Sequence, residues 1–205
     1  MHAETNISTE EAILAAARWE FELKGFDGAR MQEISDRAGI NRALLHYYFR
    51  SKEKMFEKIF DEALERFLPL LSTWDQDPEE SWERKLKRFI RTFSKFLKEN
   101  SMLFLLREII RKPDLLQSRA KKYGKKLNNF VVYFDKLKAD KFIRSDVDSR
   151  YFYIMIHSLC SFPLMNAPVF SYSLRISIKE YDALMVEYPD MMSDLLIQLL
   201  KYKED

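Results

Sequence analysis

Helix-start signals recur along this sequence and constrain its fold more than any other feature. Ser8, followed by Glu11, forms a capping box ahead of an apolar-periodic segment that Gly25 closes. The same pattern returns late in the chain at Ser177 and Glu180. Because only four glycines and six prolines occur in 205 residues, long helices are favoured over a turn-rich β fold.

The other helices are predicted from capping residues and apolar periodicity. They cover residues 30–38, 42–49 and 52–71, a segment that begins at Asp77, and then 101–111, 114–139, 148–162 and 189–203. The sequence therefore predicts an all-α protein, in which a domain of three short helices, residues 1–55, precedes a larger helical domain, residues 56–205.

Positive charge is concentrated in one N-terminal segment, although the net charge of the chain is only +2. Residues 37–58 carry six basic and two acidic side chains, whereas residues 1–36 carry three basic and eight acidic ones. A local basic segment of this kind is typical of a surface that contacts nucleic acid.

The basic segment contains the stretch "RALLHYYFRSK", residues 42–52, which reads as a short helix capped by Asn41. At about 100° per residue, Leu45 and Phe49 point toward the core, whereas Ala43 and Tyr47 point away from it. A helix-turn-helix motif is predicted here, because a short helix and the turn at "GIN" precede this stretch. The alternative is that its aromatic side chains pack between helices.

The chemistry of the exposed side chains suggests how this helix would contact DNA. Arg42 could bind guanine or a phosphate, Ala43 lets the backbone approach, and Leu44 could contact a thymine methyl group. His46 could hydrogen-bond to a base edge. The remaining contacts are predicted to be with phosphates, and their residues are Tyr47, Tyr48 and Lys52.

Three motifs at fixed spacings extend this interpretation. The segment from Ile13 to Phe56 contains IL-x-AA-x₃-F-x₃-GF, then x-x-EI-x-x-x-AGI, then L-x-x-YF-x-SKE. It resembles the N-terminal domain of the TetR family of bacterial transcriptional regulators. The resemblance implies an all-helical homodimer that binds a double-stranded DNA operator through its N-terminal helices. It also implies a C-terminal domain for a small-molecule effector that releases the operator.

Mapped onto this chain, the resemblance places the recognition helix at residues 42–48. Two positions depart from the family pattern. The position of Leu44 usually carries a small hydroxyl residue, so one hydrogen bond is lost. Ala29 and Arg30 stand where a pair of threonines usually opens the second helix, so the phosphate contact there is expected either to come from Arg30 or to be absent.

The last helix independently suggests a second copy of the chain as a partner. Apolar residues cover far more than one face of this helix, and helix 148–162 is apolar almost all round. The predicted dimer interface consists of Ser158, Phe162, Met192, Leu195, Leu196 and Leu199. The alternative is burial of both helices inside a single domain.

The effector site is less well defined by the sequence. A pocket for an apolar or aromatic, weakly polar ligand is predicted from Phe93, Phe104, Phe130, Phe134, Tyr153 and His157. His157 would be the polar contact, unless it is a core histidine bonded to the backbone.

A long uncharged segment, residues 151–174, is expected to be a buried helix and loop rather than a membrane span. It is interrupted by Pro163, Pro168 and Asn166. The single cysteine, Cys160, and the polar N-terminus favour a reducing, cytoplasmic location.

Two other classes of protein are alternatives to a regulator. An enzyme is disfavoured, because the three histidines have no metal-ligand spacing and no glycine-rich phosphate loop occurs. No metal or cofactor is therefore expected. A helical ligand-binding or scaffold protein without sequence-specific DNA binding remains the alternative.

Overall fold

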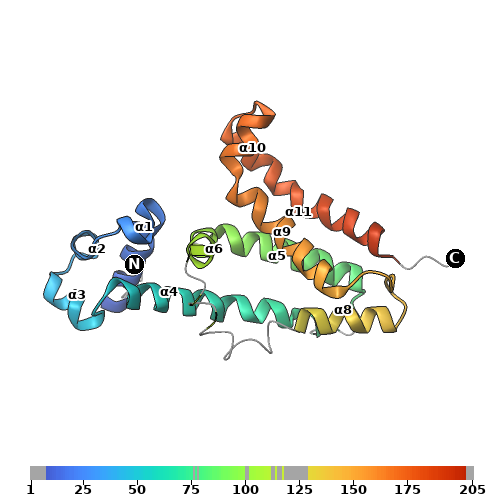
Figure 1. The fold of residues 1–205 in the computed structure, drawn as a ribbon, viewed down its shortest axis with the longest axis horizontal. Coiled ribbons are helices and arrows are strands. Elements are labelled where there is room, and N and C mark those ends of the chain that lie inside the picture. The colour runs from blue at the N-terminus through green and yellow to red at the C-terminus, as the bar shows by residue number, and fades with distance from the viewer. Residues whose placement is uncertain are drawn as a thin grey trace, which may run out of the picture. The chain divides into compact units, whose positions relative to one another are not determined.

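The computed structural model describes residues 8–75, 77, 79–99, 102–111, 114, 117 and 129–201, with backbone alone for residues 72–75. Within these residues the chain is helical, and the one β feature is an isolated bridge between Ile143 and Lys201 (Figure 1). The predicted all-α class is confirmed. Most of the predicted helix 114–139 lies outside the described residues, apart from its last turns.

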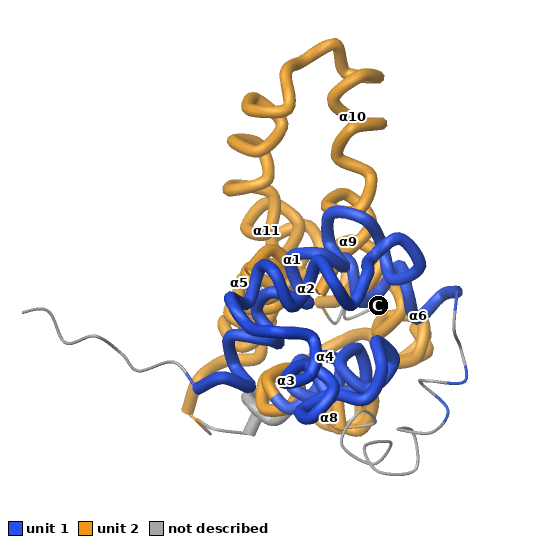
Figure 2. Tube along the Cα trace, turned by 90° about the vertical axis from the view of Figure 1, so that its left-hand side faces the viewer, with its two compact units in different colours: residues 1–65, 104–117 blue, residues 66–103, 118–205 orange. Residues whose placement is uncertain are grey.

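The chain forms two compact units (Figure 2). Unit 1 consists of residues 1–65 and 104–117, and unit 2 consists of residues 66–103 and 118–205. Unit 1 is thus larger than the predicted domain of residues 1–55, because residues 56–65 and a helix from the middle of the chain pack with it. The domain boundary at residue 55 stays a prediction.

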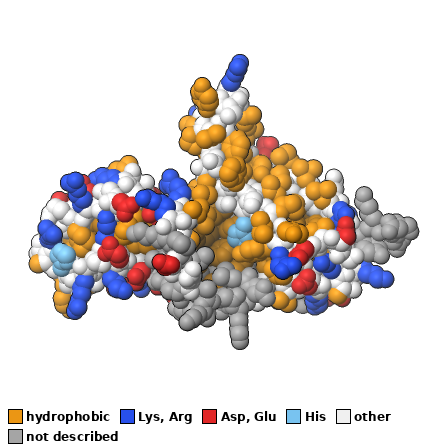
Figure 3. Space-filling view, in the orientation of Figure 1, with side chains coloured by type: hydrophobic (Ala, Val, Ile, Leu, Met, Phe, Trp, Pro, Cys, Tyr) orange, Lys and Arg blue, Asp and Glu red, His pale blue; other side chains and the backbone are white. Residues whose placement is uncertain are grey.

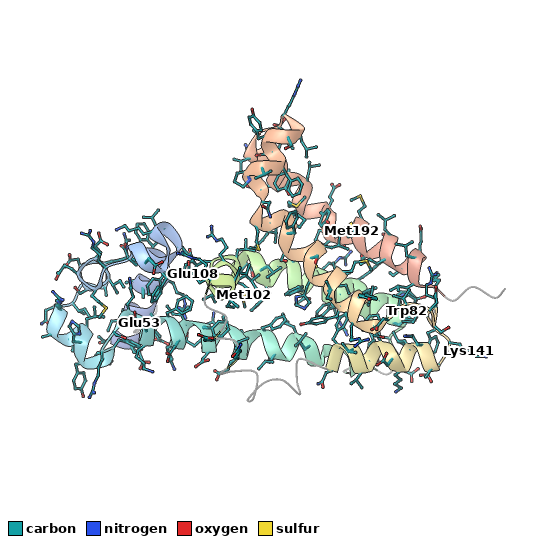
Figure 4. The ribbon with its side chains drawn as sticks, in the orientation of Figure 1. Glu53, Trp82, Met102, Glu108, Lys141 and Met192 are labelled. Carbon is teal, nitrogen blue, oxygen red and sulfur yellow. The ribbon has the colours of Figure 1, made fainter. Side chains whose placement is uncertain are left out.

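Unit 1 is built from short helices at the N-terminus and one helix from the middle of the chain. They are α1 (Thr9–Gly28), α2 (Met31–Arg37), α3 (Arg42–Tyr48), most of α4 (Lys52–Phe67) and all but the first two residues of α6 (Met102–Arg111). The predicted capping box at Ser8 and Glu11 is present at the start of α1. Gly25, at φ +72°, interrupts that helix, and the buried Glu108 of α6 lies against this break (Figure 4).

An aromatic cluster forms the core of unit 1. Phe104 of α6 stacks on Phe21 of α1, with ring centroids 6.0 Å apart, and meets Phe56 of α4 edge-on at 5.9 Å. All three rings are buried. Phe104 therefore ties α6 to the N-terminal helices, and it lies apart from the other residues predicted for the effector pocket, all of which belong to unit 2; this corrects its grouping with them.

Truncating Phe104 to alanine should destabilise unit 1 by about 3–5 kcal/mol, because it leaves a cavity between α1, α4 and α6. Thermal denaturation followed by circular dichroism measures the loss. Phe142→Ala is the matched control, since this phenylalanine is exposed and should change stability by about 0.5 kcal/mol or less. Equal losses in the two variants would contradict the assignment of Phe104 to this core.

Unit 2 contains the remaining helices. They are the 3₁₀ segment η1 (Leu68–Asp75), α5 (Trp82–Glu99), α8 (Asn129–Ala139), α9 (Ser149–Met165), α10 (Ala167–Leu174) and α11 (Ile178–Leu200). α5 packs against α9 and α11, and α8 packs against α9 and η1. The core between them is dominated by phenylalanine rings, among them Phe89, Phe130, Phe134 and Phe152.

Several predicted helix boundaries in unit 2 were wrong. α4 ends at Phe67 instead of residue 71, since Pro69 cannot donate an α-helical hydrogen bond and the chain tightens into η1. α5 begins at Trp82 instead of Asp77. The Asp77 carboxylate accepts a hydrogen bond from the Glu79 N–H at 3.0 Å, and this bond stabilises a turn ahead of the helix.

The C-terminal helix is longer than predicted. The short helix expected near Ser177 and the final helix form one continuous α11, which runs through Pro189. Pro189 is buried and α11 packs along α5, so that tertiary contacts offset the missing backbone hydrogen bond. The segment expected as a loop after Met165 is the helix α10.

No single helix among the described residues is long and apolar enough to cross a membrane. α9 and α10 pass the length and composition test only as a pair, and they are bent by 73° at their junction.

Candidate nucleic-acid interface and effector site

The helix α3 is defined by local signals on both sides. The Asn41 side chain accepts a hydrogen bond from the Leu44 N–H at 2.8 Å and caps its N-terminus, as predicted. Gly39 has φ +69°, a conformation that strains any residue with a side chain, and this residue forms the turn from α2. α3 spans Arg42–Tyr48, which are the residues expected for a recognition helix.

The two sides of α3 differ sharply in exposure. Leu45 is fully buried and Phe49, which follows the helix, is 7% exposed. Tyr47 is 81% exposed, and the other exposed members of α3 are Arg42, Ala43, Leu44, His46 and Tyr48. The predicted orientation of this helix is confirmed, and the alternative that its aromatic residues pack inside the protomer is wrong for Tyr47.

Polar and aromatic contacts organise the exposed side of α3. The Arg42 Nε donates a hydrogen bond to the His46 Nε2 at 3.4 Å, one helical turn away. Tyr47 and Tyr48 meet edge to face, with ring centroids 5.5 Å apart. Arg42 and His46 are therefore coupled, and their roles at base edges stay predictions.

Lys52 has a different environment from the one predicted. Its ammonium donates hydrogen bonds to the carbonyls of Asp27, at 3.2 Å, and Ala29, at 3.0 Å, and lies 4.7 Å from the centre of the Phe26 ring. These bonds hold the end of α1 and the link to α2. The structure thus gives Lys52 a positioning role, which corrects its assignment as a side chain free to hold a phosphate.

Replacing Lys52 by methionine should destabilise the protein by about 1–2 kcal/mol, because two hydrogen bonds from a charged group are lost. The salt dependence of DNA binding should keep its slope, whereas loss of a phosphate contact would lower that slope by about one. DNA titrations at several salt concentrations separate the two roles. Lys54→Met is the control, since Lys54 lies on the same helix and its side chain is 65% exposed.

A buried carboxylate that the sequence did not reveal fixes α1 against α2. Glu20, which is buried, pairs with Lys24 at 2.9 Å and with Arg37 at 2.9 Å. Burial opposes ionisation of Glu20, but the hydrogen bonds from the two basic residues outweigh it and lower its pKa.

The Arg30 side chain, at the start of α2, is exposed and makes no capping bond, so its phosphate contact stays a prediction.

In unit 2, the structure brings five of the predicted effector residues together. The His157 ring lies 4.8 Å from Phe93 and 4.3 Å from Tyr153, and Tyr153 lies 5.3 Å from Phe130, measured between ring centroids. Phe134 stacks on Phe130 at 4.6 Å. Phe67, which sequence reasoning missed, also contacts His157 at 6.2 Å. We call Phe67, Phe93, Phe130, Tyr153 and His157 the aromatic cage.

The predicted dimer residues divide into two groups. Ser158 and Phe162 of α9 and Leu195 and Leu199 of α11 are exposed. Hydrophobic side chains gather on the surface of unit 2 in Figure 3. Leu196 is 2% exposed and belongs to the core of its own protomer, which corrects its assignment to the interface. Met192, labelled in Figure 4, is half-buried beside a small void next to Cys160.

Known proteins resemble this chain in both sequence and fold. The sequence model for bacterial regulatory proteins, tetR family, matches residues 13–59. The transcriptional repressor NicS of Pseudomonas putida is 27% identical over 94% of this chain and 92% of its own. The transcriptional regulator RutR of Escherichia coli K12 is 35% identical, over 33% of this chain and 32% of its own.

Solved structures agree with this fold over nearly the whole chain. GusR of Salmonella enterica matches 97% of this chain and 98% of its own with a TM-score of 0.64 at 20% identity. FadR of Bacillus halodurans, described as a fatty acid degradation regulator, matches 89% and 93% with a TM-score of 0.65 at 20% identity. These solved structures show that the chain shares their fold, and its N-terminal segment, which carries the exposed face of α3, resembles the N-terminal domain of tetR-family regulators.

Proposed function

We propose that this protein is a repressor that binds a palindromic operator as a homodimer and is released by a small molecule bound in unit 2. The observation that carries the proposal is the exposed face of α3, where Tyr47 is 81% exposed beside Arg42 and His46. Exposure of such an apolar and weakly basic helix face to water is unfavourable, whereas insertion of this face into the DNA major groove would bury it.

Repression is inferred from a relative, and release by a small molecule is what the resemblance to TetR-family regulators implies. NicS, which covers almost the full length of this chain, is a transcriptional repressor by name. Binding as a two-fold dimer would place two copies of α3 on two half-sites of a palindrome. A protein acting on an operator works where the DNA is, so a cytoplasmic location follows from the proposal.

Selection of bound fragments from genomic DNA by the purified full-length protein tests this function. We expect enrichment of one or a few palindromic sites, with affinity that falls steeply as the salt concentration rises. A screen of small molecules for release of the enriched fragment then tests the repressor mechanism.

Weak binding without any enriched site would contradict operator recognition and favour a helical scaffold. The sharpest control is a chain with intact unit 2 and a disabled α3. Tyr47→Ala with Arg42→Ala serves here, since both side chains are exposed and their loss leaves the core of unit 1 intact.

A further inference from the structure

The polar tip of His157 is buried among apolar side chains of unit 2. Its Nε2 is buried and has no hydrogen-bond partner among the described residues. A polar atom in this position loses its water without gaining a bond, which is rare in folded proteins unless the atom has another use. The alternative considered from sequence, a core histidine satisfied by the backbone, does not fit this environment.

Tyr153 presents a second polar tip beside it, one helical turn earlier on α9. The two rings lie 4.3 Å apart, and the Tyr153 hydroxyl makes no hydrogen bond to any residue that the structure describes. Both side chains are half-buried, so the aromatic cage is not sealed by its own members. In Figure 3 a histidine of unit 2 is seen among hydrophobic side chains.

The described surroundings of these two tips are apolar. Burial lowers the pKa of His157 to about 4 and raises the pKa of Tyr153, and no charged side chain in the described part of the chain contributes to either shift. Both groups are therefore uncharged near neutral pH. A charged ligand would enter the cage without a counter-charge, which is costly in an apolar environment.

These observations lead us to infer that the aromatic cage binds an uncharged aromatic molecule whose single hydroxyl or carbonyl group hydrogen-bonds to His157 Nε2 and the Tyr153 hydroxyl. The inference rests on the proposed function, since it takes this cage as the effector site. The half-buried rings of Tyr153 and His157 would contact the ligand ring edge-on or offset, as aromatic rings prefer, and the buried rings of Phe67, Phe93 and Phe130 support them from behind.

Four single-ring probes that differ in charge and hydrogen bonding test the inference with the full-length protein. They are phenol, toluene, benzoate and benzylamine. Binding is followed by the NMR signals of the histidine side chains and by titration. We expect phenol to bind at millimolar concentration and to shift the His157 signal, with toluene at least fivefold weaker and the two charged probes at least tenfold weaker.

Variants on the two polar tips complete the test. His157→Leu should reduce phenol binding to the level of toluene, whereas His157→Gln, which keeps a hydrogen-bonding group, should retain part of the preference. Tyr153→Phe should weaken phenol binding. Tyr151→Phe, on the exposed side of the same helix, is the matched control and should leave it unchanged.

Binding of benzoate or benzylamine as tightly as phenol would overturn the inference. Failure of all four probes, or an unchanged phenol preference in His157→Leu, would overturn it as well. Because these readouts need no DNA, the outcome is separate from the proposed function. If the protein binds an operator but no probe shifts the His157 signal, only the inference about the aromatic cage is contradicted. If phenol binds but no operator is enriched, only the repressor proposal is contradicted.

Discussion

Placing glutamate at both Phe162 and Leu195 should convert the protein into a monomer and reduce operator affinity by at least about a hundredfold, because linked half-site binding is lost. Phe162 lies on α9 and is 56% exposed, and Leu195 lies on α11 and is 48% exposed. In a dimer that buries this surface, each new carboxylate would lose its water without a counter-charge.

The physical basis of this prediction is the apolar surface that the two helices leave uncovered in one protomer. Ile154 of α9 and Met191 and Leu199 of α11 are also more than half exposed. These large apolar side chains recur every fourth residue along α11, and clustered exposed apolar side chains of this kind mark an interaction site. A two-fold dimer would cover it with the same surface of a second copy.

Analytical ultracentrifugation of the double variant, followed by operator titration, measures both effects. Phe142→Glu is the control, because Phe142 is 54% exposed but lies between α8 and α9, outside the helices of the proposed interface. A double variant that still sediments as a dimer would place the interface elsewhere on the protein.

The second large effect is expected on α3. Arg42→Ala and His46→Ala should each reduce discrimination between operator and mutated sites by about 1–3 kcal/mol, since both side chains are predicted to contact base edges. Tyr47→Phe should instead weaken binding to every DNA sequence, operator or not, by about the same factor, because a phosphate contact carries no base preference.

The Arg42–His46 hydrogen bond sharpens this prediction. Since the two side chains contact each other at 3.4 Å, the double variant should lose less discrimination than the sum of the single variants. Binding titrations with the operator and with single-base variants of it provide the numbers. If the double variant protected the operator as well as the unaltered protein, the assignment of this face to the DNA groove would be wrong.

Much of unit 1 could be predicted from sequence because its signals are local. Asn41 caps α3, Ser8 and Glu11 cap α1, and Gly39 takes the positive φ that the turn requires. The exposed face of α3 followed from helical periodicity around one buried residue, Leu45. Each of these inferences depends on residues within a few positions of one another.

Contacts between distant residues could not be predicted in the same way. The sequence does not distinguish Phe104 from Phe93. In the structure, however, Phe104 packs against Phe21 in unit 1, and Phe93 packs against His157 in unit 2. Leu195 and Leu196 are neighbours with the same side chain, and only one of them faces the core. The sequence alone could not show which of these residues are buried, because burial depends on which helices come together.

Local signals in the amino-acid sequence were enough to establish that this chain is helical, where its N-terminal helices begin and which face of α3 meets the solvent. Hydrogen-bond caps and the helical repeat act over one or two turns, so they are encoded locally. Packing between distant segments, in contrast, makes Lys52 hold the end of α1, brings α6 into unit 1 and leaves the His157 Nε2 without a hydrogen-bond partner among the described residues. These features arise from packing between segments far apart in the chain, and their energetics depend on the buried surroundings that packing creates.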